Sequence, residues 1–401
     1  MNESIERRAL PRTLAGATIL QIVPALREEP VARAAVDMAR VLLQVGARAL
    51  VAAPSGPLVN ELTASGAEWV ALATDTLNPL RLRANARAVE ELVGLERVDI
   101  LHVHGESAAW SARGAIAGTA VWSVSTLADL PATAGMRAYY AGAMARCDRI
   151  IAPSAFAAAP IMRRFGLSPE QITVIARSID TAAFDPMAIP AGRVSALCTA
   201  WRISSNDRVV LVPGRIAPWN GQLLVPDIVR ILVEGGLRDV IFVMVGENHS
   251  HRKYATAVMK RAQEQGVASL IRMTGHFADL PSAFAVADIV LMPAMEAPML
   301  GRVVAQAQAM ARPVVTSDVG MLPEHVVTPP QLPEDVRTGW VARAGDAADF
   351  AEALGLALGL DPVAYQAMSA RSRQFAEYMF SPDSVTAATR AVYSALLAQE
   401  A

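Results

Sequence analysis

Short apolar runs alternate with longer stretches of helical spacing along most of this chain. In the first half, the apolar runs 17–24, 98–105 and 120–126 predict strands. Between the first two of them, the apolar positions of 31–46 recur at the spacing of an amphipathic helix that we expect to end at Gly46. Strands that are apolar almost throughout are typical of a parallel sheet whose two faces are covered by helices.

The same alternation begins again in the second half, where 207–214, 239–247 and 288–293 predict further strands. The intervening segment 186–206 carries two prolines and the polar run "ISSND", which is typical of a linker. The sequence therefore predicts an α/β fold with two Rossmann-like doubly wound domains. Because ligands bind beyond the carboxyl ends of such strands, we expect the two domains to face a central cleft.

The predicted domains divide within this linker. We place an N-terminal domain at 1–195, a C-terminal domain at 196–380 and a last helix at 381–401. A chain of 401 residues exceeds what one hydrophobic core usually organises, which favours two domains over one.

Composition narrows the classes of function. The chain is 53% hydrophobic and 5% aromatic, and its formal net charge of −2 provides no basic surface for nucleic acid. Cys147 and Cys198 lack the spacing of a zinc or redox motif, which favours small buried thiols. No apolar run approaches the ~20 residues of a membrane span, and the polar start has no secretory pattern.

These features predict a cytoplasmic protein. The arginines among the first 15 residues are a candidate for peripheral contact with the inner face of the cytoplasmic membrane. A frayed, solvated terminus is the alternative interpretation.

The most informative stretch for chemistry is "LVPGRIAPWNGQ" at 211–222. A strand ends at Gly214 and Arg215, and we expect Gly221 to open the following helix. Arg215 and the helix N-terminus would then suit a diphosphate at the carboxyl edge of the sheet. The alternative is that Arg215 only holds the end of its strand through contacts with carbonyl groups.

Several further motifs follow "GRIAPWNGQ" in a characteristic order. They are "VMVGEN", "MTGHFADLPSAFAVADIVLMPA" and "GRVVAQAQAMARPVVTSDVGMLPEHV", and "DILHVHG" and "VIARSIDTAAFDP" precede them. Together they resemble the family 4 glycosyltransferases over about residues 17 to 396. The resemblance implies the GT-B fold, in which the last helix leans back onto the N-terminal domain.

The resemblance also implies an activity. A nucleotide-diphosphate sugar would bind to the C-terminal domain and transfer its sugar with retention to an acceptor on the N-terminal side. No resident cofactor and no obligatory metal ion are implied, and the chain has no D-x-D pair of the kind that holds a divalent ion.

The donor motif departs from the family pattern at several positions. Arg215 is kept, but Asn220 stands where the family has a lysine that neutralises the diphosphate. The two glutamates of the family's E-x7-E motif correspond to Pro298 and Gln306. Gly301 is kept, Gln306 can still bond a ribose hydroxyl, and Glu296 is a candidate substitute for the first glutamate.

The N-terminal side departs as well. Glu29 and Pro30 occupy the likely positions of a Gly-Gly loop that lets the backbone approach the donor, and these residues remove amide donors and add negative charge. Thr126 stands where the family has a histidine beside the transferred sugar. These losses indicate either the remains or a rewriting of a donor site.

Four other residues are candidates with a structural alternative. His102 and His104 end a strand on the acceptor side; we interpret them as pointing to alternate faces, so that both cannot enter the cleft, and a structural role is the alternative. Glu247 follows a strand near the donor and can equally cap a helix. Glu324 orders the loop beside the diphosphate or caps a helix.

Three hypotheses of function follow. The first is a glycosyltransferase of cell-envelope polysaccharide or lipopolysaccharide assembly, acting on a glycan or lipid-linked acceptor. The second is a non-catalytic homologue that binds or scaffolds an active glycosyltransferase partner. The third, epimerisation of a nucleotide sugar, needs carboxylates of its own, and none is placed for it.

Overall fold

The computed structural model describes residues 13–27, 29–76, 78–118, 121–127, 142–297, 301–330 and 333–399. Contacts divide the chain into two compact units, which we call the N-terminal domain (Met1–Ser178 with Pro382–Ala401) and the C-terminal domain (Ile179–Ser381). Each is described by itself.

The first boundary differs from the predicted 195/196 because the proline-containing segment is not a free linker. It contains helix α7 (Ala191–Trp201), which packs on α10 (Leu280–Val286) of the C-terminal domain. Pro186 begins a short 3-10 turn and Pro190 caps α7, so both prolines mark the starts of helical segments.

The N-terminal domain is a seven-stranded parallel sheet in the order β3-β2-β1-β4-β5-β6-β7. Its strands are β1 (Thr18–Ile22), β2 (Arg48–Ala53), β3 (Glu68–Ala71), β4 (Ile100–His104), β5 (Trp122–Thr126), β6 (Arg149–Ala152) and β7 (Ile172–Val174). The strand order reverses between β1 and β4, which is where a doubly wound sheet offers room for a ligand.

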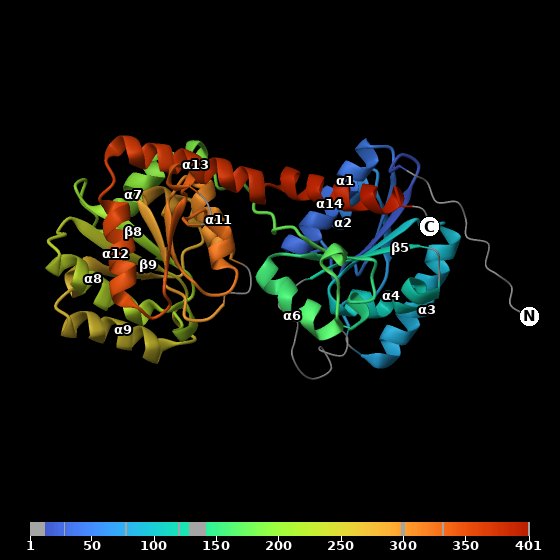
Figure 1. Ribbon diagram of the computed structural model, residues 1–401, viewed down its shortest axis with the longest axis horizontal. Helices are drawn as coiled ribbons and strands as arrows, with labels where there is room; N and C mark the ends of the chain where they lie inside the picture. The colour runs from blue at the N-terminus through green and yellow to red at the C-terminus, as the bar shows by residue number, and fades with distance from the viewer. Residues whose placement is uncertain are drawn as a thin grey trace, which may run out of the picture. The chain divides into compact units, whose positions relative to one another are not determined.

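Alternate residues of these strands pack against two different layers of helices. Ile19 and Ile100 join the core beneath α1 (Pro30–Gln44), α2 (Val59–Ala64) and α14 (Pro382–Leu397). Leu20 and Leu101 face the opposite layer, which contains α3 (Pro79–Leu95), α4 (Glu106–Gly118) and α6 (Ala155–Phe165). The last helix, α14, lies beside α1 (Figure 1). It buries Val392, Tyr393, Leu396 and Leu397 in this domain.

The C-terminal domain repeats the design with six parallel strands in the order β10-β9-β8-β11-β12-β13. Its strands are β8 (Arg208–Pro213), β9 (Val240–Val245), β10 (Ile271–Gly275), β11 (Ile289–Met292), β12 (Val314–Ser317) and β13 (Gly339–Ala342). Its other helices are α8 (Val225–Glu234), α9 (Arg252–Glu264), α11 (Arg302–Ala309), α12 (Ala347–Leu358) and α13 (Pro362–Phe380). The strands predicted from the apolar runs are confirmed in both domains.

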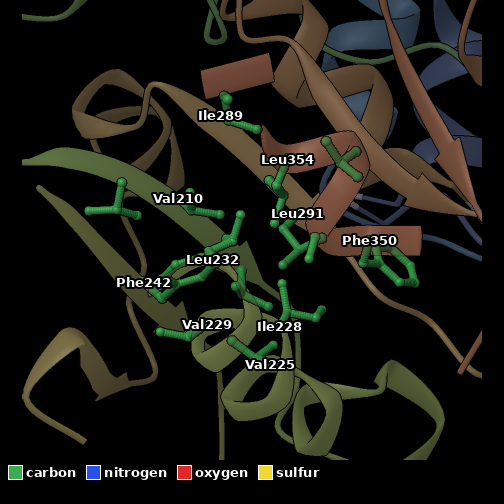
Figure 2. Packing of buried hydrophobic residues seen from close by; sticks show 14 of the residues in the cluster. Val210, Val225, Ile228, Val229, Leu232, Phe242, Ile289, Leu291, Phe350 and Leu354 are labelled. Atoms are coloured by element: carbon green, nitrogen blue, oxygen red, sulfur yellow. The ribbon is translucent and has the colours of Figure 1, made fainter. Parts of the chain in front are cut away.

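One core of this domain lies between the sheet and helices α8 and α12 (Figure 2). Ile228 of α8 and Phe350 and Leu354 of α12 are fully buried against Val210 and Leu291 of the strands. Side chains of this size contribute about 1.5–3 kcal/mol each when they are removed from water. None of the helices in the described ranges is long and apolar enough to cross a membrane.

Replacing Leu354 by alanine tests this core. Leu354 is fully buried, so Leu354→Ala should lower the free energy of unfolding of the C-terminal domain by about 2–5 kcal/mol through lost burial and a residual cavity. Leu356, on the same helix but 57% exposed, is the matched control, and Leu356→Ala should change it little. Urea denaturation followed by circular dichroism measures both; equal effects would contradict the packing.

Candidate functional site

The sequence predicted that a helix opens at Gly221, directly after the loop that follows β8. The structure differs from this prediction. Pro218–Asn220 form a 3-10 turn, Gly221 has a φ of +71°, and a second 3-10 turn precedes α8, which begins at Val225. An added Cβ at Gly221 would lie 1.7 Å from the carbonyl oxygen of Pro293, so the backbone of this loop rests directly on the loop after β11. The left-handed Gly221 ends the first 3-10 turn and a second 3-10 turn follows it, so the α-helix begins four residues later than predicted.

Two amides close this loop around the carbonyl group of Arg215. Asn220 donates from Nδ2 to that oxygen at 2.8 Å, and Gln222 donates from Nε2 to it at 3.0 Å. The side chain of Asn220 is therefore committed to the backbone and supplies no charge to a ligand. The guanidinium of Arg215 is 60% exposed and makes no hydrogen bond to a carbonyl group among the described residues, which differs from the structural alternative.

Glu247, after β9, lies opposite Arg215. Its carboxylate is 3.7 Å from Nε of Arg215 and accepts hydrogen bonds from the backbone N–H of Ser250 at 2.8 Å and from its hydroxyl at 3.2 Å. The Ser250 N–H is the main cause that lowers the pKa of Glu247, and the Arg215 charge adds to it. Glu247 thus caps the turn that leads to α9 and also offsets the charge of Arg215.

The helix after β11 begins at Gly301. This residue is the N-cap of α11 with a φ of +54°, and an added Cβ would lie 2.6 Å from the ring of His325. Gln306 of α11 is 7% exposed, and its amide makes no hydrogen bond to the described residues. The N–H groups of the first turn of α11 and this amide can serve an anion and a hydroxyl.

The structure describes some, but not all, of the residues that we expected near the donor sugar and the diphosphate. Pro298 lies outside the described residues. Glu296 is exposed and its backbone N–H donates to the carbonyl of Trp219 at 3.2 Å, while Glu324 is exposed in a 3-10 turn after β12. Gly214, Glu247, Glu296 and Glu324 all follow carboxyl ends of strands in one parallel sheet, so they gather at one edge of the C-terminal domain.

The N-terminal domain has its own polar cluster at the carboxyl edge of its sheet. His102 and His104 are both buried, with ring centroids 4.0 Å apart, and both line a cavity of about 80 Å³. The interpretation that they point to alternate faces was wrong. Residues two apart on a strand share a face, and Ile100, His102 and His104 all point toward the layer of α1 and α14.

Burial keeps both imidazoles neutral. Desolvation lowers the pKa of His104 to about 3, with a further contribution from the charge of Arg177. Desolvation is also the main cause that lowers the pKa of His102 well below its usual range, and His104 adds to it. Neither ring can act as a cation toward an anionic ligand at neutral pH.

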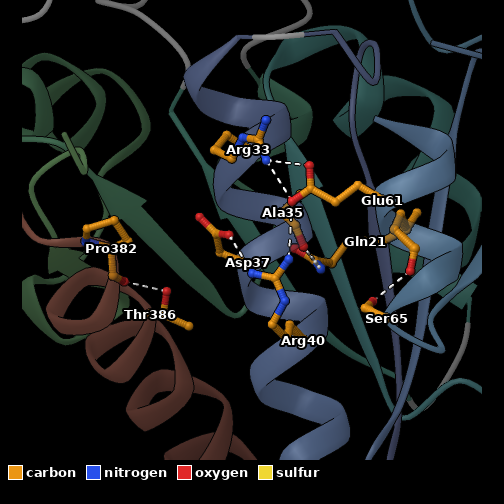
Figure 3. Close-up of polar contacts among 10 residues, drawn as sticks. Gln21, Arg33, Ala35, Asp37, Arg40, Glu61, Ser65, Pro382 and Thr386 are labelled. Carbon is orange, nitrogen blue, oxygen red and sulfur yellow. Dashed lines mark hydrogen bonds and ion pairs between the residues drawn. The ribbon is translucent and has the colours of Figure 1, made fainter. Parts of the chain in front are cut away.

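Two residues that line this cavity, and one that contacts His102 from the last helix, were missed by sequence reasoning. They are Gln21 of β1, Asp37 of α1 and Tyr393 of α14. Figure 3 shows Gln21 under α1, where it donates from Nε2 to the carbonyl of Ala35 at 3.0 Å. A glutamine within the apolar strand "TILQI" was a usable signal, because an apolar strand seldom contains a polar residue without a role.

The rim of this cavity carries charge and hydroxyl groups. Asp37 is paired with Arg40 at 3.3 Å on α1, and Thr386 of α14 donates to the carbonyl of Pro382 (Figure 3). Burial is the main cause that raises the pKa of Asp37, although Arg40 opposes it. On the loop before α1, Glu29 is the exposed N-cap residue, and its side chain makes no capping hydrogen bond. Pro30 is the first helical residue, and because proline has no backbone N–H, this helix N-terminus has one amide donor fewer.

Family models match both domains. Glycosyltransferase Family 4 matches residues 31–183, and Glycosyl transferases group 1 matches residues 207–359, which together take in most of the chain. The chain belongs to the family 4-like glycosyltransferases. The resemblance carried by the motifs is thereby confirmed.

Relatives and solved structures agree with this family. D-inositol 3-phosphate glycosyltransferase of Streptomyces scabiei is 28% identical over 256 residues, 62% of this chain and 54% of the relative. The enzyme of the same name from Salinispora arenicola is 30% identical over 193 residues, 45% of this chain and 41% of the relative. This chain thus spans about half the length of the curated relatives it matches.

Similar solved structures show the fold. A glycosyltransferase from Rickettsia africae superposes with a TM-score of 0.77 at 23% identity, covering 96% of this chain and 100% of that one. HepE from Anabaena, in complex with UDP and glucose, superposes with a TM-score of 0.68 at 18% identity, covering 94% of this chain and 100% of that one. The chain therefore has the GT-B fold, with two Rossmann-like domains.

The buried histidines predict a dependence of stability on pH. The folded pKa of each lies below the unfolded value of about 6.5, so the unfolded state binds more protons at acid pH, and stability falls as pH drops through that value. Between pH 7 and pH 5 the His104 imidazole should lower the free energy of unfolding of the N-terminal domain by about 2 kcal/mol, and His102 should act in the same direction.

Urea denaturation at the two pH values measures this dependence. His104→Gln should remove about 2 kcal/mol of the difference between pH 7 and pH 5. His276→Gln, at an exposed position of the C-terminal domain, is the control and should remove none. An unchanged pH dependence in His104→Gln would contradict a neutral, buried His104.

Proposed function

We propose that this protein transfers a sugar, with retention, from a nucleotide-diphosphate sugar to a cell-envelope glycan or lipid-linked acceptor. The observation that carries the proposal is the exposed guanidinium of Arg215, held at the carboxyl edge of the C-terminal sheet in a family 4-like glycosyltransferase. Complexes of HepE with UDP and of starch synthase IV with ADP support a nucleoside diphosphate as the ligand class. The proposal includes no resident cofactor and places the protein in the cytoplasm.

In this proposal Arg215 and the first turn of α11 at Gly301 share the charge of the diphosphate. Electrostatic stabilisation of the leaving group is the main contribution expected from such residues. Gln306 bonds a ribose hydroxyl from the same helix. Because Glu247 lies 3.7 Å from Arg215, a bound diphosphate competes with this carboxylate for the guanidinium.

The acceptor is proposed to bind to the N-terminal domain, beside His102, His104 and Thr126. The curated relatives are named for D-inositol 3-phosphate, so inositol phosphates belong in an acceptor screen beside lipid-linked glycans. Contact with the inner face of the cytoplasmic membrane would bring the protein to a lipid-linked acceptor.

A second candidate is a binding or scaffolding homologue that partners an active glycosyltransferase. The observation that favours it is the side chain of Asn220, which is bonded to the Arg215 carbonyl where the family has a lysine. One cation, itself opposed by Glu247, stabilises a leaving diphosphate much less than two. This candidate predicts nucleotide binding that is weak or absent and no turnover.

Calorimetric titration with UDP, GDP and ADP tests the proposed donor site. Arg215→Ala should weaken binding of the preferred nucleotide about 10- to 100-fold, because it removes the charged hydrogen-bond donor. Arg230→Ala, at a surface arginine paired with Glu234 on α8, is the matched control and should bind like the parent. No binding of any of the three at millimolar concentration would overturn the glycosyltransferase proposal.

Restoring the missing cation separates a working site from a relic. Asn220→Lys should tighten nucleotide binding about 10-fold by adding charge next to Arg215, and Gln306→Glu should strengthen it further through the ribose. If the parent binds a nucleotide and these substitutions improve the affinity only modestly, the altered donor site is in use. Binding that appears only in the double variant favours the non-catalytic homologue.

A further inference from the structure

The cavity of the N-terminal domain is crossed by a chain of hydrogen bonds that begins on the last helix. The hydroxyl of Tyr393 lies 2.5 Å from Nδ1 of His102, and Nε2 of His102 lies 2.7 Å from Oγ1 of Thr126. Tyr393 is fully buried, whereas Thr126 is half-buried and lines the cavity. Neither hydroxyl makes another hydrogen bond to the described residues.

The different burial of these two hydroxyls decides the direction of the chain. A neutral imidazole has one N–H donor and one acceptor nitrogen. If Nδ1 carried the proton, the hydroxyl hydrogen of Tyr393 would be buried in the core without an acceptor, which is unfavourable. If Nε2 carries it, Tyr393 donates to Nδ1 and Nε2–H donates to Thr126, whose own hydrogen then points to the cavity.

The second histidine is oriented by an amide. Because Gln21 donates from Nε2 to the Ala35 carbonyl, its Oε1 faces His104 and accepts from Nε2 of that ring at 3.4 Å. Nδ1 of His104 is then the unprotonated nitrogen, and it makes no hydrogen bond to the described residues. The two histidine chains therefore contribute one donor, the Thr126 hydroxyl, and one acceptor, Nδ1 of His104, to a cavity that Asp37, Arg177 and Thr386 also line.

We propose that Tyr393 is a positioning residue that fixes the Nε2–H tautomer of His102 and thereby aims the Thr126 hydroxyl as a donor at an uncharged hydroxyl group of a polyol ligand. That ligand hydroxyl accepts from Thr126 and donates to Nδ1 of His104. A ligand hydroxyl can both accept from Thr126 and donate to Nδ1 of His104, whereas a fully ionised phosphate has no proton to donate to that nitrogen. The class of ligand rests on the proposed acceptor site, but the tautomer does not.

Nitrogen-15 NMR of the protein labelled at its six histidines tests the tautomer without any ligand. In the parent protein His102, assigned by loss of its signals in His102→Gln, should show a protonated Nε2 and an unprotonated Nδ1. Tyr393→Phe removes only the hydroxyl and should abolish this single-tautomer pattern. Tyr378→Phe, at a 76% exposed tyrosine of α13, is the matched control and should leave it unchanged.

Two results would overturn the assignment of Tyr393: a protonated Nδ1 of His102 in the parent protein, or the same tautomer in Tyr393→Phe as in the parent. Circular dichroism of Tyr393→Phe shows whether the variant is folded. If it is not, the tautomer of the parent alone decides, since a protonated Nδ1 contradicts the proposed direction.

Titration with myo-inositol and with glucose tests the ligand class. Thr126→Val and Tyr393→Phe should each weaken binding of the preferred polyol about 3- to 10-fold, the effect of one neutral hydrogen bond, while UDP binding stays unchanged. Absence of polyol binding with the expected tautomer present would overturn the ligand class alone. Absence of UDP, GDP and ADP binding in the parent would instead count against the proposed function.

Discussion

Backbone pressed directly against backbone is the constraint on which the carboxyl edge of the C-terminal sheet depends. An added Cβ at Gly246 would lie 1.9 Å from the carbonyl oxygen of Gly214, and one at Gly221 would lie 1.7 Å from that of Pro293. The loops after β8, β9 and β11 therefore touch where no side chain fits. The contact between Gly214 and Gly246 fixes Arg215 and Glu247 opposite each other, because Arg215 directly follows Gly214 and Glu247 directly follows Gly246.

The shape of this edge is independent of its charge. Asn220 and Gln222 close the loop through the Arg215 carbonyl with neutral amides, so the loop keeps its form without a lysine. Chemistry in a GT-B protein depends on charges placed on such loops, whereas the fold depends on the buried strands beneath them. A chain of this family can therefore keep its architecture while the strength of its donor site changes.

The N-terminal domain depends on a different device, a buried polar chain completed by the last helix. Tyr393 packs among Val392, Leu396 and Leu397 and bonds His102, so the helix that covers the sheet also orients a cavity side chain. A buried polar group is stabilising only when its partners are present, which couples the position of α14 to the state of the cavity.

The sequence by itself determined the strands that the apolar runs predict, the two parallel sheets and the family, because buried parallel strands leave apolar runs and loops at their ends leave motifs. It also placed Arg215, Gly301 and Gln306 at one sheet edge. Only the tertiary structure decided that α7 belongs to the second domain, that Asn220 is spent on a backbone carbonyl, and that Tyr393 meets His102 across 291 residues. Periodicity reports which face of an element is buried, but a contact between distant segments follows only from how the elements pack together.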